Sequence, residues 1–374
     1  MNRRSTTTLC ILFLFLGIRL SFAQEGEQPL KIFGYFQGNF TYQLDQVSDV
    51  ASTSFSAQQL NLFLQKDINT NWAALVDFEV LNSFSSYRRW GAFNLEEAWV
   101  RYRNGRGFNL KLGLQIPTFN NLNEIKNKTP ILPYVIRPLA YETSFNEFIA
   151  VEEYVPSRAY VQAYGIVPAK ALKLEYAAYV GNSPNIRSQP AIGQSGVDTT
   201  TAFLVGGRVG ILAGDLKAGV SVTHERVNAL RGIDVLLIGS NEKLEEVPRI
   251  RVGLDASFIA GHMYFATEFI YVVYKENVEN LDVNKGFFYG TGGYFLKENL
   301  LAYLSYFYVR ENYTLGDEID LDIVAPTVGV AYNLNDRITF KGQYAFGMIT
   351  QNGPGDLRLK QELHYLTTAV SVVF

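Results

Sequence analysis

Charged side chains recur at every second position inside apolar runs of this chain, and this spacing is its main chemical feature. Asp77 and Glu79 stand two apart, as do Arg101 and Arg103, and Lys111 follows in the next apolar run. In an extended strand alternate side chains share one face, so each pair lies on the same side of its strand. Charges fixed side by side can hold or orient ions. They can equally form ion pairs that only stiffen a wall, and the sequence leaves both interpretations open.

The same alternation places Glu97, Arg251 and Lys341 on the polar faces of other runs. A lysine or arginine at the middle of a membrane strand costs about 2–4 kcal/mol if it faces lipid. We therefore expect these charged faces to line a watery interior. There the two neighbouring arginines and Lys111 are expected to form a basic patch on the wall.

Residues suited to catalysis are sparse. The chain has three histidines, His224, His262 and His364. Ser221 precedes the first of them by three positions, which places the two on opposite faces of a strand. The single cysteine, Cys10, lies in the N-terminal leader. We therefore predict that the protein is not an enzyme and uses neither a metal nor a cofactor.

Sixteen strands must position these side chains. The run 107–116 shows the pattern, with leucines at 110, 112 and 114 alternating with polar residues. We place strands near 30–42, 57–66, 71–82, 92–103, 107–116, 157–167, 171–181, 200–212, 215–226, 248–259, 262–275, 285–296, 299–310, 323–334, 336–349 and 361–374. Each is long enough for a tilted membrane crossing. The pattern predicts an all-β fold, a closed transmembrane antiparallel β-barrel of 16 strands.

Composition favours the same fold. Phe and Tyr number 26 and 23, a load that suits aromatic girdles at two membrane interfaces. The mean hydropathy is +0.01, as expected when an apolar face and a polar face cancel. The 33 basic residues against 36 acidic ones leave a net charge of −3, which argues against a nucleic-acid partner.

The connections alternate in length. Short turns such as Ala213-Gly214 and Ala260-Gly261 suit hairpins, and longer loops join the other strand ends. Outer-membrane barrels have short turns on the periplasmic side and long loops on the extracellular side. The third long extracellular loop, Pro117–Pro156, spans roughly 40 residues, and such length is usually functional. We expect this loop to narrow the lumen with five charged side chains, Glu124, Lys126, Lys128, Arg137 and Glu142.

The two ends of the chain point to export and barrel closure. Residues 1–23 are expected to be a signal peptide, with Arg3 and Arg4 before the apolar segment Leu9–Ile18. Residues 24–374 are expected to form one barrel domain. The chain ends on a strand-like run whose last residue is Phe374. A final strand that pairs with the first leaves no open edge.

Together these features resemble a known family. Sixteen strands, a long third loop and a terminal Phe are similar to trimeric diffusion porins of bacterial outer membranes. The segments LEEAWVRY (95–102) and KLGLQIP (111–117) resemble the phosphate-selective porin O/P type. The resemblance implies an outer-membrane location in a Gram-negative bacterium, insertion by the barrel assembly machinery, contact with membrane lipid and lipopolysaccharide, and a homotrimer.

The function implied is a passive water-filled channel for small hydrophilic solutes or ions. The alternatives are a porin specific for an anion or an oligosaccharide, and a non-conducting structural or adhesive barrel. The third loop mixes acids with bases, so phosphate selectivity does not carry over from the resemblance. Acids between Asp317 and Asp322 are expected in the seventh long loop, either as a solvated loop or as a site that bridges divalent cations or lipopolysaccharide.

Overall fold

The computed structural model describes residues 28–46, 49–81, 92–141, 155, 157–170, 172–183, 202–227, 247–275, 281–315, 317–353 and 358–374. The expected signal peptide, residues 1–23, and Glu142 of the third loop lie outside the described residues. Within the described part of the chain, no helix is long and apolar enough to cross a bilayer.

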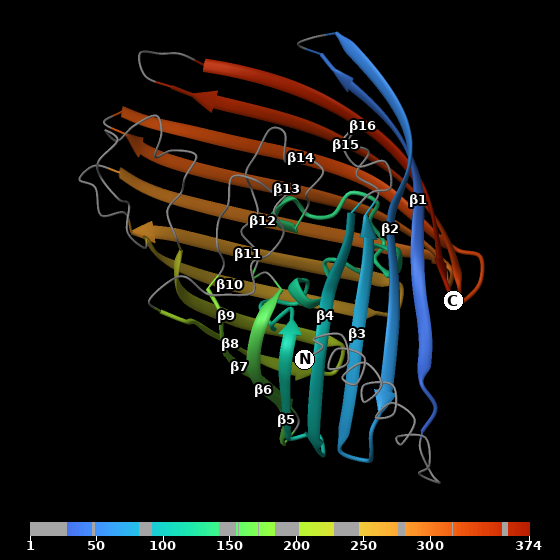
Figure 1. The fold of residues 1–374 in the computed structure, drawn as a ribbon. Helices are drawn as coiled ribbons and strands as arrows, with labels where there is room; N and C mark the ends of the chain where they lie inside the picture. The colour runs from blue at the N-terminus through green and yellow to red at the C-terminus, as the bar shows by residue number, and fades with distance from the viewer. Residues whose placement is uncertain are drawn as a thin grey trace, which may run out of the picture.

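Sixteen antiparallel strands form one closed barrel, as the alternation predicted (Figure 1). In the first half they are β1 Lys31–Asp45, β2 Val50–Asp67, β3 Trp72–Leu81, β4 Ala92–Asn104, β5 Phe108–Gln115, β6 Arg158–Ala169, β7 Leu172–Gly181 and β8 Leu204–Ala213. In the second half they are β9 Leu216–Val227, β10 Val247–Ala260, β11 Met263–Lys275, β12 Leu281–Lys297, β13 Leu300–Leu315, β14 Asp317–Asn333, β15 Ile338–Asn352 and β16 Arg358–Val373.

The last strand closes the barrel against the first. Tyr35 lies opposite Val373 in the β1–β16 register. The backbones of Gly34 and Phe374 exchange two hydrogen bonds of 2.9 Å. A Cβ at Gly34 would stand 2.7 Å from the Phe374 ring, so only glycine lets the terminal ring cover this position. Closure leaves no sheet edge, and every strand has two partners.

The wall has two chemically distinct faces. Outward residues such as Val209 and Leu304 are 65% and 67% exposed. Inward residues on the same sheet, such as Gln37 and Thr291, are fully buried. The strand period of two therefore separates an apolar outer surface from a lumen that contains polar groups.

Two strands begin six or more residues earlier than predicted. β2 starts at Val50 rather than near 57, and β14 starts at Asp317 rather than near 323. The prediction of an acidic loop over 317–322 was therefore wrong, because these residues continue a hairpin with β13. Arg310 lies across from them, with its guanidinium 3.3 Å from Asp320 and 4.0 Å from Asp322. Ile319, Leu321 and Ile323 alternate with these acids in the sequence, and the ion pairs to Arg310 support the acidic positions across the hairpin.

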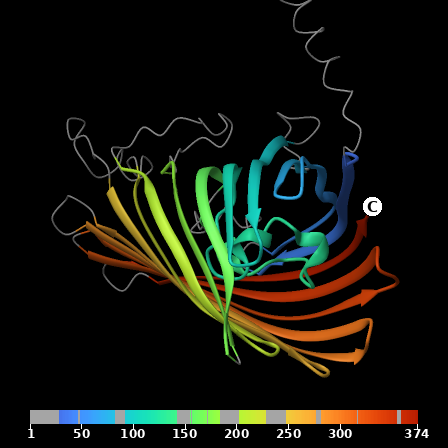
Figure 2. The ribbon, with the colours of Figure 1, turned by 90° about the horizontal axis from the view of Figure 1, so that it is seen from below.

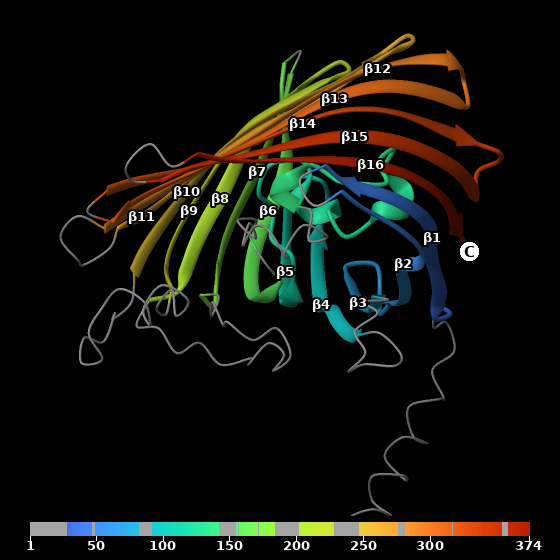
Figure 3. The ribbon, with the colours of Figure 1, turned by 90° about the horizontal axis from the view of Figure 1, so that it is seen from above.

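The described part of the segment between β5 and β6 folds into the barrel rather than away from it. These described residues contain three single-turn helices, η1 Asn123–Ile125, η2 Thr129–Ile131 and η3 Leu139–Tyr141. Figures 2 and 3 view the barrel from opposite sides, and both show this segment inside it, between β1–β5 and the strands of the second half. We call its described part, residues 116–141 with 155 and 157, the lumen loop.

Candidate functional site

The lumen loop is compact, and most of its described residues are buried or half-buried. Phe119 and Val155, near its two ends, are fully buried. Its four prolines between 117 and 138 prevent a long helix, because proline lacks the N–H that a helix interior needs. The loop therefore turns repeatedly, and many of its backbone groups bond to the barrel wall.

Glu268 of β11 is one of its two principal wall anchors. Its carboxylate accepts hydrogen bonds from the backbone N–H groups of Asn121 at 2.9 Å and Leu122 at 2.7 Å. It also accepts the hydroxyl of Tyr141 at 2.7 Å. One buried side chain thus holds the first and last described turns of the lumen loop together.

The second anchor is on β15. Gln343 accepts the backbone N–H groups of Val135 at 2.7 Å and Ile136 at 2.9 Å. Two residues earlier, the ammonium of Lys341 donates to the carbonyl of Thr129 at 2.7 Å and to Gln37 of β1 at 2.9 Å. The sequence predicted Lys341 as a pore-lining charge. In the structure it faces inward, is 4% exposed and holds the loop.

Apolar packing supports these anchors. The inner face of β11–β14 is apolar over much of its length, and it forms one buried core with the lumen loop. This core includes Leu122, Leu132, Tyr134 and Leu139 of the loop, and Ile270, Val272, Phe287, Phe307 and Val309 of the wall. Burying each such side chain stabilises by about 1.5–3 kcal/mol. The loop is consequently docked on this wall by the hydrophobic effect as well as by hydrogen bonds.

The opposite wall, β2–β4, is acidic. Asp77, Glu79, Glu96 and Glu97 are all buried and face the lumen. Asp77 accepts from the amide of Asn61 at 3.0 Å. Glu79 and Glu97 belong to the predicted pore-lining set, together with Asp77, and all three lie on the inner face.

Basic residues of the lumen loop face this acidic wall. Asn127 donates to Glu96 at 2.6 Å, which ties the loop to the acidic wall. Arg137 donates to the carbonyl of Lys126 at 2.7 Å, which joins two turns of the loop. Burial lowers the pKa of Lys126 to about 8, and the charge of Glu96 opposes that shift. Lys128, also predicted for this loop, is half-buried beside them.

A smaller charged group lies toward the end of the barrel that carries the short turns. Lys111 stands 4.0 Å from Glu97 and 3.8 Å from Glu124 of the loop. The ring of Trp99 lies 5.6 Å from the guanidinium carbon of Arg101 and 5.4 Å from the Lys111 nitrogen. The Glu124 side chain is 40% exposed, although it lies inside the barrel. This spot is therefore open to water.

The remaining predicted residues lie apart from this group. Arg103 is exposed near the turn that follows β4. Arg251 is completely buried on β10 and pairs with Glu225, which also takes Arg249 at 2.6 Å. The structure therefore brings Lys111, Glu97 and Glu124 together but leaves Arg251 in a separate network.

Two residues of the site, Glu96 and Trp99, were missed from the sequence. Glu96 and Glu97 both face inward because a bulge shifts the β3–β4 register beside Asp77. The adjacent pair of glutamates breaks the alternation, which was the available signal for this bulge. Trp99 was missed because aromatic residues were assigned to girdles, although it shares its face with Arg101.

Comparison with known proteins rests on structure alone. No family model matches the chain, and no curated protein matches it. The anion-selective porin from Comamonas acidovorans matches with a TM-score of 0.64 at 13% identity, covering 92% of this chain and 99% of that one. The channel DcaP of Acinetobacter baumannii matches at 0.63 and 13%, covering 94% and 99%. OmpT of Vibrio cholerae, in its trimer form, matches at 0.57 and 14%, covering 93% and 100%.

The chain has the outer-membrane porin fold. The matches extend over nearly the whole of each porin, so the likeness concerns the complete barrel. Two of the matched proteins are described as an anion-selective porin and an outer membrane channel. Within this porin fold, the lumen loop divides the interior into a charged side and an apolar side.

Proposed function

We propose that the protein is a passive channel for small hydrophilic solutes and ions in the outer membrane of a Gram-negative bacterium. The observation that carries this proposal is a charged loop held across the lumen of a closed barrel, with a water-exposed carboxylate, Glu124, on its charged side. Charges facing one another across a narrow passage set ion preference. The proposed passage runs between the lumen loop and β3–β5, past Arg101, Lys111 and Glu97.

We infer that this channel has only mild ion selectivity. Several cations of the lumen have carboxylate partners close by, such as Lys111 near Glu97 and Arg208 with Asp255 at 2.6 Å. Paired charges present a weaker field to a passing ion than isolated ones. The motif resemblance at 95–102 and 111–117 supports a second candidate, an anion channel of the phosphate-selective type.

A non-conducting structural barrel is the alternative from another class. The extensive docking of the lumen loop on β11–β15 favours it, because a loop buried on one whole wall narrows the interior. The water-exposed Glu124 favours the channel instead.

The proposal also covers assembly. OmpT of Vibrio cholerae is described in a trimer form, and we propose a homotrimer for this chain. Insertion by the barrel assembly machinery, with contacts to membrane lipid and lipopolysaccharide, completes the proposal. The size of the detergent-extracted protein, compared before and after heating, tests the trimer.

Planar-bilayer recording tests the channel. Protein extracted in detergent is added to one side of a bilayer in symmetric KCl, with detergent alone as the control. Ohmic steps together with a small reversal potential in asymmetric KCl are the expected result. A reversal potential that indicates strong anion selectivity, together with block of the current by phosphate, would favour the phosphate-selective candidate. Insertion without any steps would overturn the channel in favour of the structural barrel.

A further inference from the structure

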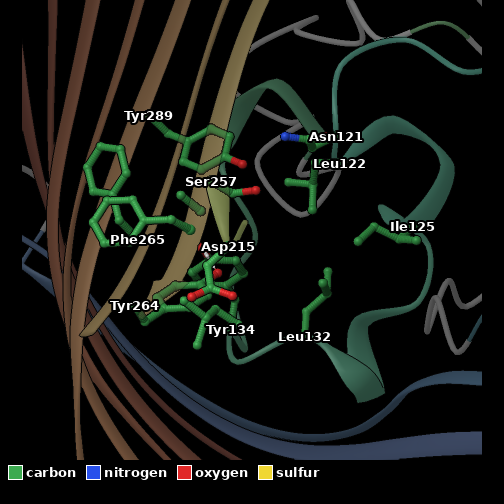
Figure 4. Close-up of a pocket in the computed structure, with 13 residues that line it drawn as sticks. Asn121, Leu122, Ile125, Leu132, Tyr134, Asp215, Ser257, Tyr264, Phe265 and Tyr289 are labelled. Atoms are coloured by element: carbon green, nitrogen blue, oxygen red, sulfur yellow. Dashed lines mark hydrogen bonds between the residues drawn. The ribbon is translucent and has the colours of Figure 1, made fainter. Parts of the chain in front are cut away.

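A cavity of about 340 Å³ lies between the lumen loop and the wall of β10–β12 (Figure 4). The loop contributes Leu122, Ile125 and Leu132, whose side chains point toward the wall. The wall contributes Ser257 and two tyrosines. Small-molecule sites begin at about 300 Å³ and are mostly apolar with a few polar groups. This cavity has the size and lining for one ring with a small substituent.

The cavity is placed away from the charged passage. Asp215, in the turn between β8 and β9, stands at its rim, and Ser257 lies near the end of β10 that leads into the next short turn. Tyr264 and Tyr289 line it from β11 and β12. The cavity therefore belongs to the short-turn end of the barrel, on the apolar side of the lumen loop.

Asn121 supplies an oriented hydrogen-bond donor. Its amide oxygen accepts from Arg208 at 3.3 Å, which fixes which end of the amide faces the cavity. Among the described residues, its amide nitrogen is buried with no hydrogen-bond partner. Figure 4 shows this nitrogen pointing toward the side of Tyr289. A buried donor without an acceptor is unfavourable, and a ligand acceptor would satisfy it.

Charge decides the class of ligand. Asp215 stands at the rim of the cavity. Glu268, on the β11 wall, accepts the backbone N–H of Asn121. The nearby cation, Arg208, is held by Asp255. The surroundings thus disfavour an anion, while the tyrosines and leucines favour an apolar ring.

We propose that this cavity binds a neutral solute that carries a flat apolar ring and a hydrogen-bond acceptor. The ring lies between Leu122 and Leu132 of the loop and Tyr264 of the wall, and the acceptor meets the amide of Asn121. For its part in transport this site rests on the proposed channel, but binding itself does not require conductance.

Binding of three isosteric probes to the detergent-extracted protein tests the site. The probes are 4-fluorobenzamide, 4-fluorobenzoate and 4-fluorobenzamidine, each followed by the broadening of its fluorine NMR line, with detergent micelles alone as a blank. Saturable broadening of the benzamide is the expected result. The benzoate lacks a favourable environment for its charge, and the amidine lacks an acceptor for Asn121. Both should bind at least about threefold more weakly.

Two variants and a matched control locate the site. Ser257→Phe fills the cavity and should weaken benzamide binding by about tenfold or more. Asn121→Leu keeps the apolar lining but removes the donor, and should weaken it by about fivefold. Thr41→Phe adds the same ring to the inner face of β1, outside the cavity, and should leave binding unchanged.

The outcomes separate this inference from the proposed channel. Equal broadening in wild type, Ser257→Phe and the micelle blank overturns the cavity site, whatever the conductance. Equal binding of benzamide and benzoate overturns the neutral ligand class. Saturable, variant-sensitive binding by a protein that shows no conductance would support the site and overturn the channel alone.

Discussion

The two walls that hold the lumen loop do so by different chemistry. On β11–β15, buried aliphatic and aromatic side chains pack on the loop, and Glu268 and Gln343 bind its backbone N–H groups. On β2–β4, carboxylates face the basic side chains Lys126 and Arg137. Apolar packing excludes water, whereas buried charges are tolerated only when they are paired or hydrogen-bonded. The apolar wall therefore docks the loop over a broad surface. The charged wall holds it through hydrogen bonds such as that from Asn127 to Glu96, and it carries the charges that can act on ions.

Because the two walls differ in this way, substitutions on the apolar wall should mainly affect stability, and substitutions on the charged wall should mainly affect ion selectivity. Removing a buried hydrogen-bond acceptor from the apolar wall leaves several donors without partners, and each costs about 1–3 kcal/mol. Removing a half-exposed charge from the other wall changes stability by at most about 1 kcal/mol. The predicted effects on the loop are thus largest on β11 and smallest on β4.

The largest effect is expected from Glu268→Ala. The substitution removes the acceptor shared by the N–H groups of Asn121 and Leu122 and by the Tyr141 hydroxyl. Docking of the loop should weaken by about 3 kcal/mol or more. Trypsin should then cut after Lys126, which is 1% exposed in the folded barrel. The rate of this cleavage is the measurement.

Glu268→Gln is the matched control. Its amide oxygen still accepts the two backbone N–H groups, so resistance to trypsin should largely return. Cleavage of the two variants at equal rates would show that the carboxyl position does not anchor the loop. Resistance of Glu268→Ala itself would show that apolar packing alone is sufficient.

Lys341→Met should have an intermediate effect. The methionine keeps the volume but leaves the carbonyls of Thr129 and Pro130 without their donor, and Gln37 loses its contact as well. We expect a loss of about 2 kcal/mol in the unfolding free energy. Thermal unfolding measured by circular dichroism gives this value, and Thr41→Val on the same inner surface is the control. An unchanged or higher melting temperature would refute Lys341 as an anchor.

The strands could be read from the sequence because their signal is local. Alternation of leucine and polar residues around Lys111 required no knowledge of the partner strands. Two strand starts were missed. Serines and a threonine dilute the apolar pattern after Val50, and the acids after Asp317 were assigned to a loop although Ile319, Leu321 and Ile323 alternate with them. The cross-strand partners show that both segments are paired.

The site was less accessible because its contacts join distant parts of the chain. Gln343 binds the backbone of Val135, and Glu268 that of Leu122, and no sequence spacing links such pairs. The apolar lumen wall did leave a trace. Ile270 and Val272 alternate with aromatic lipid-facing residues, so β11 is apolar on both faces. A doubly apolar strand indicates burial on both sides.

The ion selectivity set by the charged wall should depend on pH. The pKa of Lys126 is lowered to about 8 by burial, so the loop loses this positive charge as the pH rises through that value. Arg137 then remains as a loop cation that faces the acids of β3 and β4, and the cation-to-anion permeability ratio should rise about twofold between about pH 6.5 and 9.5. Reversal potentials in asymmetric KCl measure the ratio. Lys126→Met, permanently neutral at this position, should show a smaller rise than the wild type.

The lowered pKa of Lys126 also determines whether the free energy of unfolding rises or falls with pH. The folded pKa of Lys126, about 8, lies below the unfolded value near 10.4, so the unfolded chain binds more protons between these limits. Stability should therefore rise with pH in this window, and the rise should be absent in Lys126→Met. A loss of stability specific to Lys126 above pH 8 would contradict the burial of its ammonium.

The smallest effect is expected from Arg101→Ala combined with Arg103→Ala. Arg101 lies beside Trp99 near the open carboxylate Glu124, whereas Arg103 is exposed at the rim. Neither anchors the loop through a described hydrogen bond, so melting should change by less than about 1 kcal/mol. The reversal potential should move toward cations by about 1.5-fold in permeability ratio. Arg337→Ala, in an exposed turn, is the control. A ratio equal to wild type would show that these arginines stiffen the wall without acting on ions, and the charged side would then depend on Lys111 and the loop alone.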